Sequence, residues 1–256
     1  MNRRIVILGL IGLIVGFFSG LFGVGGGIIL VPLLVLSLHY QQRQASGVSL
    51  AAVLPSAVAG MIGYASRGEV DWVAGLVLAA GAVCGSLLGT WLLHRLPQKL
   101  LRWMFIVFLI AVAIRMLFLV PDRGAELEFT PLIIGGLLLL GLVTGILSGL
   151  LGIGGGVVVV PALMLLFGVG DLVAKGTSLL MMIPTAITGT LANARRGNVD
   201  LRTSAIIGLL AIPASFGGVA VAAIIPPQLG SILFALLLAY SIGQLTWTAL
   251  RERRRE

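Results

Sequence analysis

The chain has 256 residues, of which 59% are hydrophobic and 10% are charged, and its mean hydropathy is +1.14. A soluble domain carries roughly 25% charged residues, so the composition excludes that class. The formal net charge of +8 does not indicate a nucleic-acid partner, because the basic residues lie in short loops and at the termini, where membrane proteins carry topology signals.

Two long stretches, 5–42 and 129–170, contain no Asp, Glu, Lys or Arg. An α-helix crosses the hydrocarbon core with about 20 apolar residues, so each stretch is too long for one crossing. A β-barrel would need segments of alternating hydrophobicity, and these stretches are continuous. The composition therefore predicts an all-α polytopic membrane protein. Arg3 and Arg4 precede an apolar run as in a signal peptide, but no small-residue cleavage site follows, so we interpret the run as a retained first segment.

The first element, residues 5–38, is broken by glycines in the phrase GFFSGLFGVGGGIILVP. Three consecutive glycines are unfavourable in a helix, where each costs about 1 kcal/mol relative to Ala. We therefore expect one helical arm over 5–22, a turn at 23–27, and a shorter arm over 28–38 that is about 16 Å long.

The turn has a predicted chemical role. The short arm covers half the hydrocarbon core, so the turn should lie near mid-membrane, where unbonded N–H groups cost several kcal/mol each unless something binds them. Glycine permits left-handed backbone, and the N-terminus of the short arm adds a partial positive charge, so the turn suits an anion. The other interpretation, close packing of helices on small residues, fits Gly12, Gly16 and Gly20, which lie four apart on one face.

The whole sequence pattern occurs twice in the chain. Sliding the chain by 129 residues aligns 12–32 with 141–161 at 12 identical positions of 21, and the second phrase reads GILSGLLGIGGGVVVVP. We expect a first transmembrane repeat over 1–120, a linker over 121–130 and a second repeat over 131–256, which together form one integrated unit. Three ordinary spans should follow each broken segment, at 45–65, 72–93 and 100–120, and at 174–194, 201–222 and 229–249.

Positive charges predict that the two repeats are inverted. The loop 94–102 holds three basic residues and its counterpart 223–231 holds none, whereas 66–71 holds one and its counterpart 195–202 holds three. Because loops rich in Lys and Arg face the cytoplasm, the halves should lie in opposite orientations. Each broken segment must then enter and leave on the same side, as a re-entrant hairpin. This topology places both termini in the cytoplasm.

The doubled phrases carry a resemblance to a known family. SGLFGVGGGIILVP and SGLLGIGGGVVVVP, followed by GVSLAAVLPSAVAG and GTSLLMMIPTAITG, resemble the TauE/SafE family of sulfite exporter-type membrane transporters over nearly the whole chain. The resemblance implies a multi-pass protein of the bacterial inner membrane. It further implies a secondary transporter that moves a small organosulfur anion (sulfite, sulfonate or sulfoacetate-like). An anion channel is the alternative.

We predict that the anion binds between the two glycine turns, held mainly by backbone N–H groups. The hydroxyls of Ser19 and Ser148 precede the turns at equivalent places and are predicted donors, although a helix serine most often bonds the carbonyl one turn before it. The predicted substrate-binding residues are Ser19, Gly23, Gly25, Gly26, Gly27, Ser49, Ser148, Gly152, Gly154, Gly155, Gly156, Thr177 and Ser178.

Other polar and helix-breaking positions have narrower predicted roles. Pro55 and Pro184 interrupt equivalent spans and are predicted hinges or structural kinks. Arg115 lies inside an expected span, where it either serves the site or snorkels to the outer interface. Asp71 and Asp200 are expected to cap the helices that follow them, and a role in proton coupling is the alternative. Further polar candidates are Ser56, Thr185 and Asn193.

No enzyme is predicted, because the spans lack paired carboxylates, a His–Glu metal pair and a Ser–Lys or Ser–His dyad. The glycine phrase is not a nucleotide fingerprint, since position 28 is Ile and no Walker lysine follows. The single Cys84 excludes an internal disulfide and a multi-cysteine metal site, so we expect no metal and no cofactor. The expected partners are the small anion and the lipid bilayer. Coupling to H+ or Na+ stays open, as does the choice between monomer and homodimer.

Overall fold

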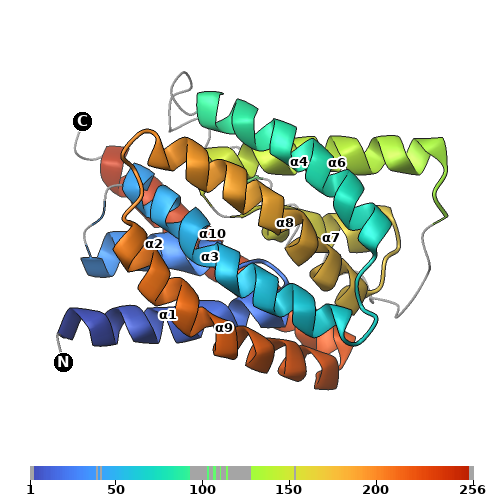
Figure 1. The fold of residues 1–256 in the computed structure, drawn as a ribbon, viewed down its shortest axis with the longest axis horizontal. Coiled ribbons are helices and arrows are strands. Elements are labelled where there is room, and N and C mark those ends of the chain that lie inside the picture. Colours follow the sequence, from blue (N-terminus) through green and yellow to red (C-terminus); the bar gives the residue numbers. More distant parts are fainter. Residues whose placement is uncertain are drawn as a thin grey trace.

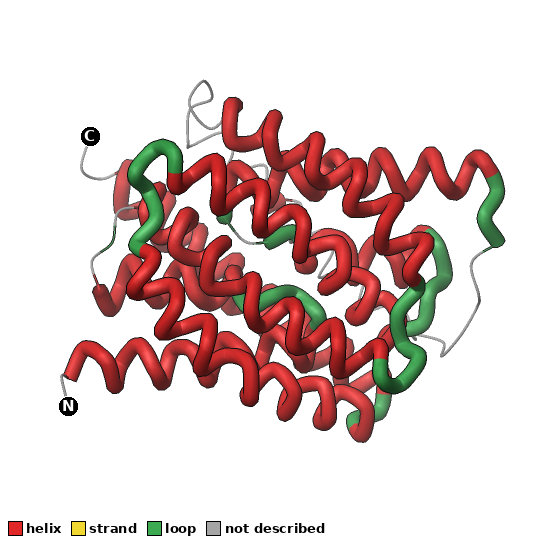
Figure 2. Tube along the Cα trace, viewed as in Figure 1, coloured by secondary structure: helices red, strands yellow, loops and turns green. Residues whose placement is uncertain are grey.

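The fold was taken from a computed structural model that describes most of the chain. The described residues are 3–38, 40, 42–92, 103, 106–107, 110, 114, 128–152 and 154–253. Helices and short connections make up these ranges, with no β-strand among them (Figure 2). The expected span at 100–120, including Arg115, lies largely outside the described residues, as does the loop 94–102.

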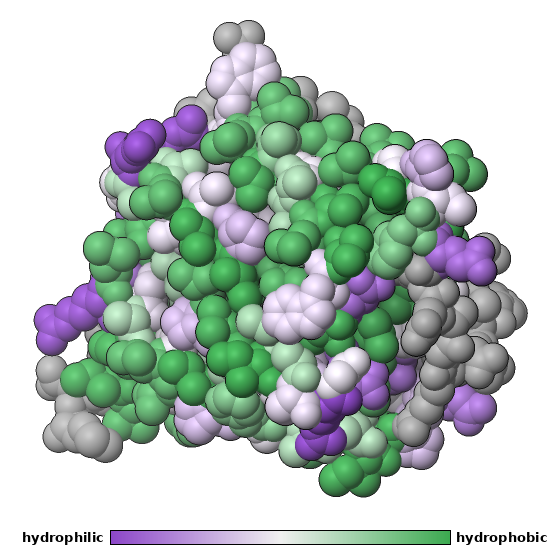
Figure 3. All heavy atoms as spheres, turned by 45° about the vertical axis from the view of Figure 1, so that its right-hand side comes forward, coloured by the Kyte–Doolittle hydropathy of each residue, from purple (hydrophilic) through white to green (hydrophobic). Residues whose placement is uncertain are grey.

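The helices lie close to the expected elements. They are α1 (Arg3–Phe22), α2 (Gly27–Leu38), α3 (Gln42–Ala65), α4 (Trp72–Leu92), α6 (Pro131–Leu151), α7 (Gly156–Leu166), α8 (Asp171–Ala194), α9 (Leu201–Ile224) and α10 (Pro227–Arg253). Within the described ranges, 7 helices are long and apolar enough to cross a membrane. Large apolar side chains are exposed on the outer surface, and they cover most of the face shown in Figure 3. The chain is therefore an all-α, multi-pass membrane protein.

Helix α1 packs on α9 through a row of glycines. The contacts pair Gly12 with Ile207, Gly16 with Ala211, and Gly20 with Ser215. A Cβ at any of these glycines would collide with a backbone carbonyl of α9. Only glycine lets the two backbones approach this closely, so the packing role predicted for these three residues is confirmed.

Helices α4 and α6 pack in the same way. Here Gly141 lies against Leu78 and Gly145 against Ala82, again with no space for a Cβ. Under the 129-residue shift, α6 is the counterpart of α1 and α4 is the counterpart of α9. Each half therefore lays its first helix against the fourth helix of the other half, and the two halves interlock.

Helix α3 and its counterpart α8 run in opposite directions. Early residues of α3 meet late residues of α8, since Leu50 faces Gly189, and late residues of α3 meet early ones of α8, since Tyr64 faces Gly176. Helices α3 and α8, which are counterparts, are thus antiparallel neighbours, as Figure 1 also shows. By contrast, α1 and α9 are parallel, because the residue numbers of their contacting pairs increase in the same direction along both helices.

The predicted N-caps are confirmed at both aspartates. Asp71 Oδ1 accepts a hydrogen bond from the N–H of Ala74 at 2.9 Å, and Asp200 Oδ1 accepts one from the N–H of Thr203 at 3.1 Å. Each side chain satisfies an N–H group that the first turn of a helix leaves unbonded. The caps fix the starts of α4 and α9.

Candidate functional site at two glycine turns

The first turn connects α1 to α2 and depends on glycine backbone. Gly23 ends α1 by donating its N–H to Ser19 O at 2.9 Å. The φ angles of Gly23, Gly25 and Gly26 are 68°, 73° and 69°, a left-handed region that residues with a Cβ rarely adopt. Helix α2 then begins at Gly27. The predicted turn at this phrase is confirmed.

The second turn repeats the same geometry between α6 and α7. Gly152 caps α6 and donates its N–H to Ser148 O at 2.8 Å. Gly154 and Gly155 have φ angles of 84° and 81°, and α7 starts at Gly156. The duplicated sequence has therefore produced a duplicated fold.

Both broken segments return to the end of the bundle from which they start. Tyr40, which follows α2, donates a hydrogen bond to Asp200 at 2.7 Å, and Asp200 caps the start of α9, the helix that runs parallel to α1. In the second half, the ring of Phe167 at the end of α7 lies beside Gly136 near the start of α6. Each segment is thus a hairpin with one long arm and one short arm.

The first turn extends from near one end of the bundle to its middle. Gly23 packs against Lys175, in the second turn of α8, whereas Gly25 packs against Met182 and Val53, halfway along α8 and α3. The long arm therefore crosses most of the bundle before the chain folds back. By length and composition α1 and α6 each count as full spans, because their apolar windows hold 18 and 21 residues.

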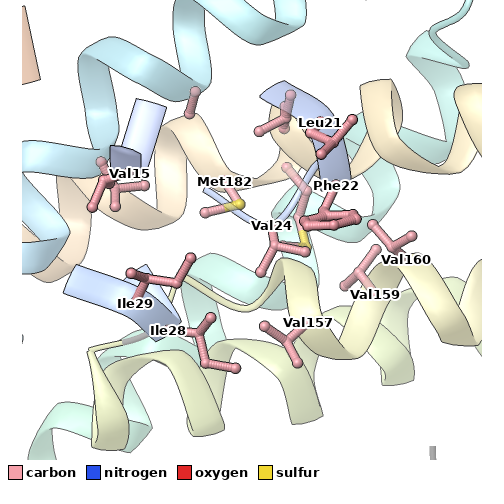
Figure 4. Packing of buried hydrophobic residues seen from close by; sticks show 14 of the residues in the cluster. Val15, Leu21, Phe22, Val24, Ile28, Ile29, Val157, Val159, Val160 and Met182 are labelled. Atoms are coloured by element: carbon pink, nitrogen blue, oxygen red, sulfur yellow. The ribbon is translucent and has the colours of Figure 1, made fainter. Parts of the chain in front are cut away.

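The two turns touch each other. A Cβ at Gly156 would lie 2.6 Å from Gly23 O and 2.7 Å from Val24 Cα, so the first residue of α7 rests on the backbone of the first turn. The methyl group of Met182 occupies the space between Gly25 and Gly154, and Figure 4 shows this side chain beside Val24. The space between Gly25 and Gly154 is therefore filled by an apolar side chain in this conformation.

Buried hydroxyl groups beside the turns have no hydrogen-bond partner. Elsewhere in the described spans most Ser and Thr hydroxyls bond a carbonyl of their own helix, as Ser86 does with Val83 O and Thr185 with Met181 O. Among the described residues, the buried hydroxyls without a partner are those of Ser19, Ser49, Thr144, Ser148 and Thr190. All of these except Thr190 lie on helix faces around the two turns. A buried polar group left unsatisfied costs about 1–3 kcal/mol, so these hydroxyls are the candidate side-chain donors of a ligand site.

Backbone donors add to these hydroxyls. Among the backbone hydrogen bonds that the described residues form outside regular helix pairing, none uses the N–H groups of Gly25, Gly26 or Gly27, and none uses those of residues 154–156. They include the N–H groups at the starts of α2 and α7, which have no acceptor within their own helix. Together with the helix dipoles they make a positive, donor-rich environment.

Comparison with known proteins assigns the chain to a family. The family model "Sulfite exporter TauE/SafE" matches residues 1–116 and 137–256, nearly the whole chain. The chain belongs to the TauE/SafE family. It is 30% identical over 239 residues to the probable membrane transporter protein YunE of Bacillus subtilis, a match that covers 83% of this chain and 85% of YunE.

Other TauE/SafE relatives agree with this assignment. The chain is 29% identical to the probable membrane transporter protein YdhB of Bacillus subtilis, over 77% of this chain and 80% of YdhB. It is 33% identical to the probable membrane transporter protein MJ0441 of Methanocaldococcus jannaschii, over 60% of this chain and 59% of that protein. No solved structure matches the chain. The family supports membrane transport as the general role.

The remaining candidate side chains of this TauE/SafE protein already have partners. Ser178 donates to Gly23 O at 3.0 Å and so braces the first turn. Thr177 accepts the N–H of Asp71 at 3.0 Å, which ties α8 to the loop before α4. Three others bond carbonyls of their own helices: Ser56 to Val53 O, Thr185 to Met181 O and Asn193 to Gly189 O. These contacts are structural in the conformation described.

The two prolines lie inside unbroken helices. Pro55 belongs to α3 and packs on α9, where a Cβ at Gly208 would come within 2.9 Å of its ring. Pro184 lies at the matching place in α8. Their predicted role as hinges stays a prediction. Within the described ranges, no three His, Cys, Asp or Glu side chains gather as metal ligands.

Sequence reasoning missed two features of the site. Thr144 is fully buried, its hydroxyl has no partner, and its methyl group lies against Gly155. The only signal was a polar residue at the position where the first half has Val15. The second feature is the buried ion pair between Lys175 and Asp171, with 3.3 Å between Nζ and Oδ2. Its signal was the i,i+4 spacing of opposite charges in an otherwise apolar segment.

Proposed function

We propose that this TauE/SafE protein is a secondary transporter of a small organosulfur anion across the bacterial inner membrane. Sulfite, a sulfonate or a sulfoacetate-like compound would bind at the two glycine turns. The observation that carries this proposal is the set of buried, unpartnered hydroxyls around the first residues of α2 and α7. The description of the family as sulfite exporters supports the substrate class.

The chemistry of the turns suits an anion that must be both bound and released. A sulfonate or sulfite carries three acceptor oxygens and sheds water when it enters the membrane. Hydroxyl groups, glycine N–H groups and two helix N-termini replace that water with neutral donors. A fixed cation in contact with the anion would hold it more tightly and slow its release, and a carrier needs both steps to be fast.

The arrangement of the halves supports alternating access. The counterpart helices α3 and α8 are antiparallel, and each half contacts the other through its first helix, so the halves can rock about the turns that lie between them. We propose that residues 1–120 and 131–256 form one inverted pair joined by 121–130, with both termini in the cytoplasm. Pro55 and Pro184 would absorb the bending, and Met182 would leave the space between the turns as the site opens.

Flux measured in proteoliposomes tests this function. Purified protein should show saturable uptake and counterflow of at least one anion among sulfite, thiosulfate, sulfoacetate, taurine and sulfate. Repeating the uptake with imposed H+ or Na+ gradients identifies the coupling ion. Flux without saturation or counterflow would identify an anion channel instead. Absence of both flux and binding for the whole panel would contradict the proposed substrate class.

A further inference from the structure

We propose that the anion binds off the pseudo-symmetry axis, at the second turn alone, and that Thr144, Ser148 and Ser49 donate its three side-chain hydrogen bonds. This inference rests on the proposed transport function and deepens it. It assigns Thr144 as a binding residue and gives the first turn a structural role. Four observations lead to this asymmetric site.

The axis itself is filled by apolar atoms. A Cβ at Gly25 and a Cβ at Gly154 would both collide with the methyl group of Met182, and Val53, the counterpart of Met182, lies 2.8 Å from the Gly25 position. An anion on the axis would have to contact these side chains and lose its hydrogen bonds. The polar groups lie to the sides of this apolar pair, next to one turn or the other.

The second turn has more free donors on its own hairpin. Thr144 and Ser148 lie one turn apart on α6, and a Cβ at Gly155 would be 2.6 Å from Thr144 Cγ2 and 3.6 Å from Ser148 Cβ. Both residues are at most 1% exposed, and neither hydroxyl has a partner. At the first turn the residue that faces Gly26 in place of Thr144 is Val15, which has no hydroxyl. Of Val15 and Ser19, the counterparts of Thr144 and Ser148, Ser19 alone carries a hydroxyl.

The serines on α3 and α8 beside the turns also differ, since Ser49 has a free hydroxyl and Ser178 does not. On α3, Ser46 packs against Gly152, and Val53 lies 2.8 Å from the Cβ position of Gly25 and 3.8 Å from that of Gly154. Ser49 lies between Ser46 and Val53 on the same face of α3, and we assign it to the second turn because of its neighbour Ser46. The hydroxyl of Ser49 is buried and unpartnered. The hydroxyl of its counterpart Ser178 already donates a hydrogen bond to Gly23 O.

The number of free hydroxyl groups therefore differs between the two turns. The second turn has three free buried hydroxyls, matching the three oxygens of a sulfite or sulfonate, and the N-terminus of α7 adds backbone donors and a partial positive charge. The first turn has one free hydroxyl, and Ser178 braces its carbonyl. The first turn thus packs against the second and completes its wall, as the contact of Gly23 and Val24 with Gly156 shows.

Hydroxyl-deletion variants of the full-length protein, titrated calorimetrically with sulfite and with sulfoacetate, test the inference. Thr144→Val keeps the methyl contact with Gly155 and removes only the hydroxyl, and Thr144→Ser restores the hydroxyl. We expect Thr144→Val, Ser148→Ala and Ser49→Ala each to weaken binding about tenfold or more, because each bond is made to a charged ligand. Thr144→Ser should bind within about threefold of the unmodified protein.

Two further variants complete the test. Ser19→Ala removes the free hydroxyl of the first turn, and Thr190→Val removes a buried, unpartnered hydroxyl on α8 away from both turns. Thr190→Val should bind like the unmodified protein, and Ser19→Ala should weaken binding less than Ser148→Ala. If Ser19→Ala weakens binding as much as Ser148→Ala, or if Thr144→Val has no effect, the asymmetric site is wrong although the transport function stands. If the unmodified protein binds neither anion, the proposed substrate class fails instead.

Discussion

At the scale of single residues, position 155 requires glycine for both its backbone conformation and its close contact with Thr144. Its φ of 81° is strained for any residue with a Cβ, and a Cβ there would press on Thr144. Gly197 offers a matched comparison, since its φ is 71° but nothing lies within 4 Å of its Cβ position. The two positions share the backbone strain and differ only in their surroundings.

This pair separates loss of binding from loss of stability. We expect Gly155→Ala and Gly197→Ala each to lower the free energy of unfolding by about 1 kcal/mol from backbone strain, and Gly155→Ala to lower it by about 1–3 kcal/mol more because its Cβ collides with Thr144. Only Gly155→Ala should also weaken anion binding, by about tenfold or more, because it displaces Thr144 and the turn N–H groups. Thermal unfolding and calorimetric titration measure the two effects. Unchanged binding in a folded Gly155→Ala variant would mean that the turn is only a packing device.

Asp200 shows a residue-scale effect of pH on stability. Burial would raise the pKa of this carboxyl, but hydrogen bonds from Thr203, from Tyr40 and from the N–H of Arg202 outweigh burial and lower the pKa from 3.8 to about 2. A lowered pKa means that the folded state favours the carboxylate. The stabilisation is therefore complete above about pH 4 and is lost as the pH falls through about 2.

The variant Asp200→Asn tests this dependence. At pH 7 it should unfold more easily by about 1 kcal/mol, a modest amount because the group is largely open to solvent screening. The difference in Tm from the unmodified protein should shrink as the pH falls from 4 to 2. A difference that stays constant over that range would show that the carboxylate charge does not stabilise the cap.

At the scale of elements, the close contact of α1 with α9 joins the two halves. Gly16 leaves no space for a Cβ, because one would collide with the backbone of Ala211. Gly135, on the exposed side of α6, has nothing within 4 Å of its Cβ position. Both glycines lie inside helices, where Ala is otherwise the better residue by about 1 kcal/mol.

The two substitutions to Ala should therefore have opposite effects. Gly16→Ala forces the helices apart, which costs about 1–3 kcal/mol and lowers Tm by about 3–10 °C. Gly135→Ala should leave Tm unchanged or raise it slightly. Differential scanning calorimetry of the protein in detergent would measure both changes in Tm. If Gly16→Ala proved as stable as Gly135→Ala, the α1–α9 contact would not hold the halves together.

Local sequence signals predicted the elements well because their causes are local. The glycine turns, the aspartate caps and the apolar spans each follow from a few neighbouring residues, and α4 begins at the expected residue 72. The pairing of hydroxyls was not predictable in this way. Thr144 looked like any helix threonine, and only the closed hairpin places it against Gly155 and leaves its hydroxyl without a carbonyl. The position of Gly23 along the helix bundle likewise depends on how α1 packs against α8 and α9.

At the scale of the whole molecule, the proposed inverted topology assigns each loop to one side of the membrane. The exposed Cys84 is first replaced by Ala, and single cysteines are then placed in four loops. We expect cysteines in 94–102 and 195–202 to react only from the cytoplasmic side, and cysteines in 66–71 and 223–231 only from outside. If 94–102 and 223–231 reacted from the same side, the inverted topology would be wrong.

The central claim is that an oxyanion binds at the glycine turns, and locating an anion in the protein tests it most directly. Selenite has the shape and charge of sulfite and scatters X-rays anomalously, so its position can be read from a crystal of the complex. The account predicts a selenium peak within hydrogen-bond distance of the N–H groups of residues 154–156 and of the hydroxyls of Thr144 and Ser148. A fully occupied peak away from both turns, for instance beside Arg115, with none at the turns, would contradict it.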